Sequence, residues 1–383
     1  MALKVAKRGL VPPFIVMDVM RAAAERAAAG DDVLHLEVGQ PSTGAPQAVL
    51  EAAKSALDAD PIGYTLALGI EPLRARIARH YADEYGVAIP EERIVVTTGS
   101  SGAFLLAFLA AFEPGDRVGL AAPGYPAYRN ILTALGITPV LLPVGAQSHF
   151  QPSSAILEAV GESLDGLIVA SPSNPTGSML GAAELGDLAR YCHDQGIRLV
   201  SDEIYHGITY GERAVTAAAQ STEAIVVNSF SKYYSMTGWR LGWMVVPPDI
   251  LRAVECLAQN FFISPPTLSQ RAALAVFDCR EELDRNVARY ARNRALLLEE
   301  LPKAGFHRLA PADGAFYLYA DIAHLSNDSQ EFCRRMLTET GVAATPGVDF
   351  DPEQGHRAMR FSFAGSTEDM AEAAGRLRRW QSR

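Results

Sequence analysis

Residues Gly166–Gly177 read GLIVASPSNPTG, and this stretch decides the fold class. A short apolar run ends at Ala170 and is followed at once by small polar residues and two prolines. Such a run, bounded by turn residues, is typical of a strand that ends in a turn. Because proline fixes its own backbone, the two prolines hold the turn that presents Asn174.

The same pattern recurs between about residues 90 and 230. Short β-branched apolar runs predict strands at Arg93–Thr97, Asp116–Ala121, Thr138–Leu142, Gly166–Ala170, Ile197–Ser201 and Ala224–Asn228. Amphipathic stretches between them predict helices at Ser101–Phe112, Ala127–Leu135, Ser154–Val160 and Ala182–Gln195. This alternation predicts an α/β core, a mostly parallel, doubly wound sheet with helices on its faces.

The character of the chain changes after Pro265-Pro266. A long charged helix is predicted at Arg280–Leu301, followed by separated strands near Ala315–Ala320 and Ala358–Phe363 and a last helix from Glu368. This pattern favours a smaller α+β domain. We therefore expect a large domain over residues 46–275 and a small domain made of residues 1–45 and 276–383. The first 45 residues are expected to pack on the small domain or against a partner chain.

Composition excludes several classes of protein. The chain has 383 residues and a formal net charge of −10, which disfavours nucleic acid as the main partner. Its four cysteines are scattered without paired spacing, so neither a metal site nor a disulfide framework is expected. The apolar stretch Phe104–Phe112 is too short to span a membrane, and Pro12 and Pro13 interrupt any signal peptide. We expect a cytoplasmic enzyme with no membrane partner.

Polar residues that follow strands are the first candidates for a site, because open α/β sheets bind ligands at the carboxyl ends of their strands. After the first predicted strand, Ser100, Ser101 and Gly102 lie in a small turn that leads into a helix. The free N–H groups and the positive end of that helix can hold a phosphate. A simple turn with a serine cap explains the same residues.

Three more side chains follow strands. Asn174 can donate a hydrogen bond to a ring oxygen, although an Asx turn would use the same residue locally. Asp202 comes directly after an apolar strand, with Tyr205 three residues further on. A carboxylate and a phenol suit a heteroaromatic cofactor, since the first keeps a ring nitrogen protonated and the second binds a ring oxygen. A helix cap or a solvated acid is the alternative for Asp202.

The most specific stretch is SFSKYYSMTGWRLG, residues Ser229–Gly242. Lys232 lies there among hydroxyls and aromatic rings rather than on a charged helix face. Desolvation lowers the pKa of such a lysine and frees its amine to form a Schiff base. Arg240 offers planar donors for a phosphate dianion, with Ser229 and Ser231 as hydroxyl partners. An exposed loop lysine is the alternative.

At these residues the chain resembles the class I/II aminotransferases, fold-type I pyridoxal 5'-phosphate (PLP) enzymes similar to aspartate aminotransferase, over nearly its whole length. The resemblance implies that Lys232 binds PLP covalently and that Arg240 binds its phosphate. Asn174 and Tyr205 would bind the phenolic oxygen of the ring, and Asp202 its nitrogen. It further implies transfer of an amino group between an L-α-amino acid and a 2-oxo acid by ping-pong kinetics.

Four further positions take their roles from the resemblance. Tyr125 would stack on the PLP ring, and Tyr64 would reach the phosphate of a neighbouring subunit, which implies a homodimer with shared active sites. Arg360 would bind the substrate α-carboxylate beside Asn174, and the backbone at Gly39 would contact the same group. Without the resemblance, these residues read as a core tyrosine, a turn tyrosine, a solvent-facing strand residue and a turn glycine.

Two other functions share these motifs. Relatives with the same PLP residues include C–S β-lyases and related lyases, so the reaction type stays open between aminotransfer and elimination. PLP-binding transcription regulators also carry this domain, but the motifs here begin by Gly39 and the charge is acidic. The apolar run Pro13–Met17 falls where relatives line the side-chain pocket and offers no cation for a second carboxylate. We expect an uncharged amino donor.

Overall fold

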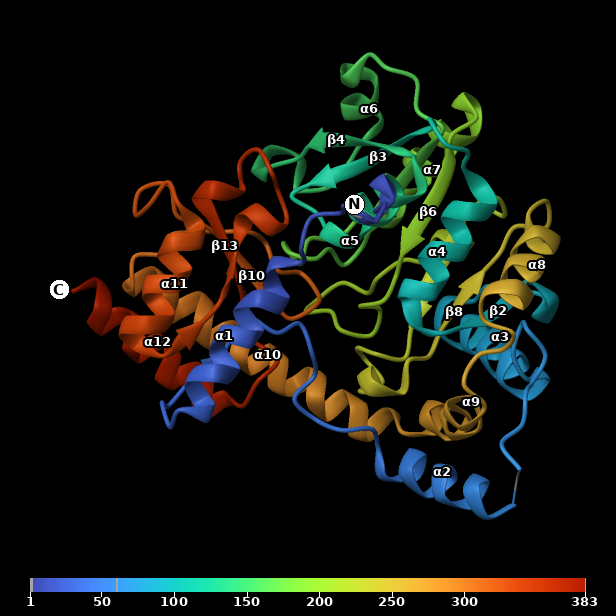
Figure 1. Cartoon of the computed structure of the whole chain (residues 1–383), viewed down its shortest axis with the longest axis horizontal. Helices are drawn as coiled ribbons and strands as arrows, with labels where there is room; N and C mark the ends of the chain where they lie inside the picture. The colour runs from blue at the N-terminus through green and yellow to red at the C-terminus, as the bar shows by residue number, and fades with distance from the viewer. Residues whose placement is uncertain (1–2, 60, 383) are drawn as a thin grey trace.

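In the computed structural model, which describes residues 3–59 and 61–382, a seven-stranded sheet forms the core of the larger lobe (Figure 1). The strand order is β2-β8-β7-β6-β5-β3-β4, and β8 alone runs in the direction opposite to the other strands of this sheet. The strands are β2 (Ile94–Thr97), β3 (Arg117–Ala122), β4 (Thr138–Pro143), β5 (Gly166–Ala170), β6 (Arg198–Asp202), β7 (Ile225–Ser229) and β8 (Gly242–Val245). The expected doubly wound α/β class is confirmed.

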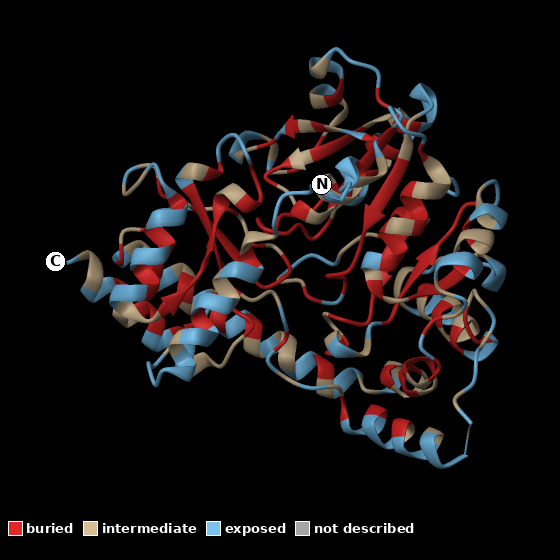
Figure 2. Cartoon of the chain, in the orientation of Figure 1, coloured by how far each residue is buried: buried red, intermediate tan, exposed pale blue. Residues whose placement is uncertain are grey.

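Helices cover both faces of this sheet because its strands are apolar on both sides. Ile94 and Val96 of β2 point into one core and Val95 into the other. The first core is closed by α2 (Gln47–Ala59), α3 (Glu71–Tyr85), α6 (Ser154–Val160), α7 (Ala182–Gln195) and α9 (Thr267–Ala273). The second is closed by α4 (Gly99–Ala111), α5 (Pro126–Leu135) and α8 (Leu251–Phe261). Figure 2 shows the buried strands between the partly exposed helices.

The smaller lobe is α+β, as expected. Its antiparallel sheet has the order β12-β13-β10-β9, formed by β9 (Arg308–Leu309), β10 (Tyr317–Asp321), β12 (Thr345–Pro346) and β13 (Ala358–Ser362). A parallel pair joins β1 (Leu34–His35) to β11 (Val342–Ala343). The helices are α1 (Ile15–Ala28), α10 (Arg280–Lys303), α11 (Ser329–Thr340) and α12 (Thr367–Gln381). The core of this lobe includes Ile204 and Tyr205, which follow β6 of the large sheet.

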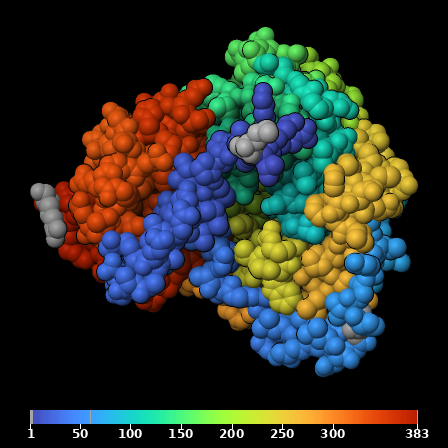
Figure 3. Space-filling view, viewed as in Figure 1, coloured from blue at the N-terminus to red at the C-terminus, as the bar shows by residue number. Residues whose placement is uncertain are grey.

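The N-terminal segment runs from one lobe to the other. Its first turn, Lys7–Gly9, contacts α5 of the large lobe, whereas α1 packs on β11 and β12 of the small one. Figure 3 shows this segment, in blue, lying across the boundary between the lobes. Packing of part of the first 45 residues on the small lobe is therefore observed. The exact domain boundaries at residues 45/46 and 275/276 stay a prediction.

The sequence reading misses β8. Its four residues directly follow the lysine-bearing turn and pair between β2 and β7, a position that depends on strands far away along the chain. The observed strand ends also differ slightly from the predicted ones. The predicted strand ends at Ser201, whereas β6 ends at Asp202, which is therefore its last residue rather than the residue after it. Among the described helices, none is both long and apolar enough to span a membrane.

Candidate active site

A cavity of about 500 Å³ opens between the two lobes at the carboxyl ends of the large sheet's parallel strands. Most of the predicted site residues meet there, although they come from segments more than 300 residues apart. Its lining includes Gly39, Ser100, Ser101, Tyr125, Asn174, Asp202, Tyr205, Ser231, Lys232, Arg240 and Arg360. The topology thus brings together side chains that the sequence places after separate strands.

Lys232 lies in the turn after β7, and its amine points into this cavity. The Nζ atom donates a hydrogen bond to the carbonyl of Gly39 at 2.5 Å and lies 5.7 Å from the centre of the Tyr205 ring. Burial lowers the pKa of the Lys232 amine to about 8, and the positive charge of Arg360 acts in the same direction. A substantial fraction of the amine is therefore neutral near pH 8, the form that acts as nucleophile and base.

Asp202 provides the negative charge at the base of the cavity. The residue is 3% exposed, and its Oδ1 atom accepts a hydrogen bond from the Ile204 N–H at 3.1 Å. The hydroxyl of Tyr128 donates to Oδ2. Burial raises the pKa of Asp202 to about 6, although Tyr128, Ile204 and Lys232 pull the pKa back down. The group is still mostly ionised at neutral pH, facing a cationic ligand nitrogen if one is bound.

Tyr128 was missed by the sequence reading. It lies three residues after Tyr125, so both tyrosines point from one face of the start of α5, and their ring centres are 5.2 Å apart at 79°. Tyr125 lines the cavity with its ring. The helical spacing of the two tyrosines was the available signal, but the partner of Tyr128 lies 74 residues further on.

Arg360 lies on β13 and is 2% exposed. Its Nη1 donates to Asn174 Oδ1 at 2.9 Å, and its Nη2 donates to the Glu37 carbonyl at 2.5 Å. The guanidinium carbon sits 4.3 Å above the Tyr317 ring. Its Nε–H is buried without a hydrogen-bond partner, and the described residues place no carboxylate within ion-pair distance. A buried charge of this kind favours an anionic ligand, and the planar fork suits a carboxylate.

Tyr317 is a second residue that the sequence reading missed. Its hydroxyl exchanges a hydrogen bond with the hydroxyl of Tyr205 at 2.7 Å. A Cβ atom added at Gly39 would fall on this same hydroxyl. Gly39 is therefore required for a steric reason, since only glycine leaves room for Tyr317 beside the carbonyl that holds Lys232. The aromatic run on β10 gave no sign of which ring faces the cavity.

The start of α4 forms a cradle for an anion. Gly99 has a φ of +76°, and a Cβ atom there would lie 2.8 Å from Arg240 Nη2. Thr98, at the N-cap position, makes no side-chain cap, so the first N–H groups of α4 lack that partner. Ser100 and Ser101 line the cavity beside them. A helix N-terminus with an adjacent guanidinium is a good phosphate site.

Three predicted residues do not line the cavity. The Ser229 hydroxyl bonds to the Ser231 hydroxyl at 2.9 Å and accepts from the Ser231 N–H at 3.1 Å, so it shapes the turn behind Ser231. Gly102 packs against the Thr98 side chain in the first turn of α4. Tyr64 is 84% exposed and lies away from the cavity of its own chain.

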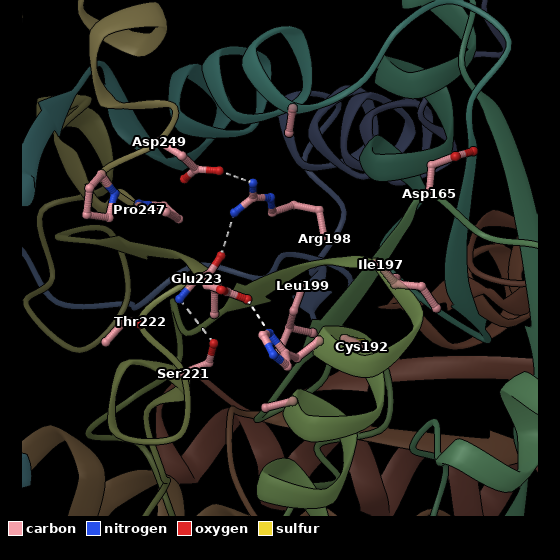
Figure 4. Close-up of a pocket in the computed structure, with 16 residues that line it drawn as sticks. Asp165, Cys192, Ile197, Arg198, Leu199, Ser221, Thr222, Glu223, Pro247 and Asp249 are labelled. Carbon is pink, nitrogen blue, oxygen red and sulfur yellow. Dashed lines mark hydrogen bonds and ion pairs between the residues drawn. The ribbon is translucent and has the colours of Figure 1, made fainter.

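A wider hollow of about 610 Å³ lies at the opposite, amino-terminal edge of the sheet's parallel strands (Figure 4). Most of its charged side chains are paired with one another, whereas Asp165 accepts from the Arg117 N–H at 2.7 Å. Arg198 pairs with Asp249 and donates to the Glu223 carbonyl at 2.9 Å, while His193 bonds the Glu223 carboxylate at 2.8 Å. Because these groups are already paired, the cavity at the carboxyl edge, with its buried Lys232 and the unpartnered Nε–H of Arg360, is the better candidate for the active site.

Comparison with known proteins agrees with this geometry. The chain matches the family Aminotransferase class I and II over residues 31–377. A valine–pyruvate aminotransferase from Mycobacterium tuberculosis is 51% identical over 381 residues, 98% of each chain. The crystal structure of an aminotransferase from M. tuberculosis covers 100% of both chains with a TM-score of 0.98 at 50% identity. An aspartate aminotransferase from Thermus thermophilus with maleate covers 99% of this chain and 100% of its own, with a TM-score of 0.92 at 30% identity.

Proposed function

The chain belongs to the class I and II aminotransferase family, and on this premise we propose that it is a PLP-dependent enzyme that transfers the amino group of an uncharged aliphatic L-amino acid, valine first, to pyruvate. Aminotransferase activity between amino and 2-oxo acids follows from the family and from the 51% identical relative. The comparisons support this activity and not the lyase or the transcription regulator.

One observation carries the choice of donor. Among the residues that line the cavity, the cations are Lys232, Arg240 and Arg360. We assign Lys232 to the cofactor aldehyde, Arg240 to its phosphate and Arg360 to the substrate α-carboxylate, so none is left for a second carboxylate. Another part of the cavity lining comes from the start of α1 and is apolar. It is formed by Phe14, Val16, Met17 and Met20. A second substrate carboxylate would be desolvated against this wall without a partner, which is costly. An aliphatic side chain gains by the same contact.

The residues present fit PLP. The cradle formed by Gly99, Arg240 and the serines at the start of α4 suits its phosphate. Tyr125 presents a ring for stacking, and Asp202 is a buried carboxylate for the pyridine nitrogen. Lys232, with its lowered pKa, is the amine for covalent attachment. When bound, PLP supplies an electron sink for the bonds at the substrate Cα.

The chain's own residues account for the remaining steps that we propose. Arg360 binds the α-carboxylate of the donor through its unpartnered Nε–H and the neighbouring Nη groups, with Asn174 fixing the guanidinium. The neutral Lys232 amine would take the proton from the donor Cα and, when the acceptor is converted, deliver a proton to the Cα of the product amino acid. Tyr205 is kept in place by Tyr317. The donor leaves as a 2-oxo acid before pyruvate binds, so ping-pong kinetics are expected.

We also propose a homodimer. Several large apolar side chains are exposed near Tyr64, including Leu66 at 71%, Phe261 at 54% and Ile263 at 53%. Segment 63–65 is tied to the one after Ile263 by Thr267, whose hydroxyl donates to the Gly63 carbonyl at 2.6 Å, and by Ser264. An exposed apolar surface of this kind suits a second copy of the chain. Tyr64 would then reach the phosphate site of the partner subunit. A cytoplasmic location is also proposed, in keeping with four free cysteines.

The test combines cofactor and chemistry. Borohydride reduction of the enzyme loaded with PLP, followed by peptide mapping, should label Lys232; a label elsewhere contradicts the assignment. Valine with pyruvate should yield alanine and the matching 2-oxo acid. Aspartate should be a much poorer donor, and a clear preference for aspartate contradicts the proposed donor class. Sedimentation of the wild type and the Leu66→Glu variant checks the dimer.

A further inference from the structure

The helix α1 begins without a cap of its own. Phe14 occupies the N-cap position and has no side-chain oxygen, so the first N–H groups of the helix need another partner. Asp349 supplies it from the other end of the chain. Its Oδ1 accepts from the Ile15 N–H at 3.2 Å and its Oδ2 from the Val16 N–H at 3.1 Å. The carboxylate is 2% exposed and lies at the positive end of the helix, where a negative charge is favoured.

The turn that Asp349 holds is also the apolar wall of the active site. Phe14, Val16 and Met17 come from this turn and line the cavity, and Met20 follows one turn later. The ring of Phe14 packs edge-on against Tyr125, with centres 5.8 Å apart at 78°. Because both carboxylate oxygens are used on consecutive N–H groups, they fix the direction of the helix as well as its position.

The loop that carries Asp349 also reaches the carboxylate-binding arginine. Thr345, four residues earlier on β12, accepts a hydrogen bond from Arg360 Nη2 at 3.3 Å. On the far side, Arg129 of α5 donates to the Asp349 carbonyl at 3.5 Å. One short segment, residues 345–349, therefore sets the distance between the group that binds the substrate carboxylate and the wall that meets the substrate side chain.

From this geometry we propose that Asp349 is a positioning residue that sets the side-chain selectivity of the enzyme, by holding α1 at the distance from Arg360 that an aliphatic side chain fills. The inference rests on the proposed function, because the wall matters only if it meets the donor's side chain. Alanine, which reaches the wall least, should depend on Asp349 less than valine does.

Asp351 offers a matched control. It is a buried carboxylate in the same loop, 6% exposed, and its Oδ1 accepts from the Glu353 and Gln354 N–H groups, both at 2.9 Å. The Asp351→Ala substitution thus removes two backbone hydrogen bonds without touching α1. Asp349→Ala removes both bonds to α1, and Asp349→Asn keeps one acceptor and is the milder variant.

The experiment compares kcat/KM for valine, with pyruvate as acceptor, and for alanine, with the 2-oxo acid of valine as acceptor, in the PLP-loaded wild type and the three variants. Asp349→Ala should lower the ratio of kcat/KM for valine to kcat/KM for alanine about tenfold, the effect of a methyl-sized misfit in an apolar pocket. The ratio for Asp349→Asn should lie between those of the wild type and Asp349→Ala. Asp351→Ala should leave the ratio within about twofold. Equal losses for both donors, or the same shift in Asp351→Ala, would overturn the proposal.

Amide hydrogen exchange gives a readout that needs no turnover. Peptides covering residues 15–20 should exchange faster in Asp349→Ala than in the wild type and Asp351→Ala, because the first turn loses its cap. If amide exchange in these peptides is unchanged in Asp349→Ala, then Asp349 does not stabilise the first turn of α1, whatever the variant's activity. A wild type that uses neither donor contradicts the proposed function instead, and the two failures are thereby distinguished.

Discussion

Arg360 and Asn174 meet across the two lobes, with Arg360 Nη1 donating to Asn174 Oδ1 at 2.9 Å. Arg360 comes from the small-lobe sheet, and Asn174 from the turn after β5 of the large one. The asparagine therefore fixes the plane of the guanidinium before a substrate arrives. Because that plane matches a carboxylate, we expect the contact to prepare the site for the α-carboxylate of a substrate and to leave selectivity to other residues.

The first prediction concerns the planar fork of Arg360. Arg360→Lys keeps the charge but loses the fixed donors to Asn174, Glu37 and the substrate, so kcat/KM should fall at least about a hundredfold, equivalent to about 3 kcal/mol or more. Steady-state kinetics with valine and pyruvate provide the measurement. As a control, Arg308→Ala removes an exposed pair with Asp321 and should change the activity less than about twofold. A mild loss in Arg360→Lys would show that the carboxylate binds elsewhere.

The second prediction concerns the pKa of Lys232, which burial and then Arg360 lower to about 8. The neutral amine increases as pH rises through this value, so the rate of covalent labelling of the apoenzyme by PLP should rise to a plateau above about pH 8. Replacing Arg360 by Met removes a nearby positive charge and should move the midpoint to higher pH. Labelling is followed by borohydride reduction and mass spectrometry of the Lys232 peptide. A midpoint that stays unchanged in the Met variant contradicts the electrostatic coupling.

The third prediction separates activity from stability at Asp202. Burial raises the folded-state pKa of Asp202 to about 6, so the folded protein binds a proton that the unfolded chain has already released. For this group, stability is highest at low pH and falls as pH rises from about 4 to 6, on the order of 2–3 kcal/mol in all. Asp202→Asn keeps an acceptor for Tyr128 but has no charge to bury. The apo variant should melt at or above the wild-type temperature at pH 7.5, while transamination falls at least about a hundredfold.

If apo Asp202→Asn melts at a lower temperature than the wild type, the claim that burial of the ionised Asp202 carboxylate destabilises the apo protein is wrong. The Asp249→Asn variant serves as the control, since Asp249 is an exposed partner of Arg198 at the far edge of the sheet. Its activity and melting temperature should both stay close to those of the wild type.

The site residues that the sequence predicts without the family resemblance share one property: each lies at or just after the end of an apolar run. Asn174 and Lys232 lie in the turns after β5 and β7, Asp202 is the last residue of β6, and neighbouring parallel strands bring these ends together. The class of fold and these side chains are therefore readable from local pattern, and their assigned roles stay predictions. Tyr128, Tyr317 and Asp349 have no such signal. Their contacts join segments 74, 112 and 333 residues apart, and only the folded chain shows which hydroxyl or carboxylate is used.

The fourth prediction concerns His206, which lies behind the active site. Its Nε2–H donates to the Ser171 carbonyl at 3.0 Å, while Nδ1 lies 2.8 Å from the Tyr85 hydroxyl and 3.5 Å from the Glu203 carboxyl group. Burial lowers the pKa of His206 to about 3. The unfolded chain gains a proton near pH 6.5, so this stabilisation is present above that pH and is lost as the pH falls. His206→Phe leaves the carbonyl and the phenol unpaired and should lower the free energy of unfolding by about 1–3 kcal/mol.

Urea unfolding of the apoenzyme at pH 7.5 and 5.5 measures this effect. The wild type should lose more stability than His206→Phe between the two pH values, because only the wild type has this buried neutral imidazole. Equal losses would show that His206 does not carry the pH dependence. His324→Phe, an exposed histidine on the small lobe, provides the control, with stability close to that of the wild type.

The fifth prediction uses the steric relation between Gly39 and Tyr317. A methyl group at Gly39 would overlap the Tyr317 hydroxyl, and the ring carbon that carries this hydroxyl would lie at 3.0 Å. Gly39→Ala must therefore displace either the tyrosine or the carbonyl that binds Lys232, and kcat/KM should fall about tenfold to a hundredfold. Tyr317→Phe alone should lower kcat/KM less, because it loses only one hydrogen bond, that with Tyr205.

In the Gly39→Ala/Tyr317→Phe double variant, the hydroxyl is absent and the methyl group finds part of the space it needs. Activity should then recover above the level of Gly39→Ala, a coupling that a double-mutant cycle measures directly. Strictly additive losses would show that Gly39 is needed for its backbone freedom rather than for the room it leaves to Tyr317.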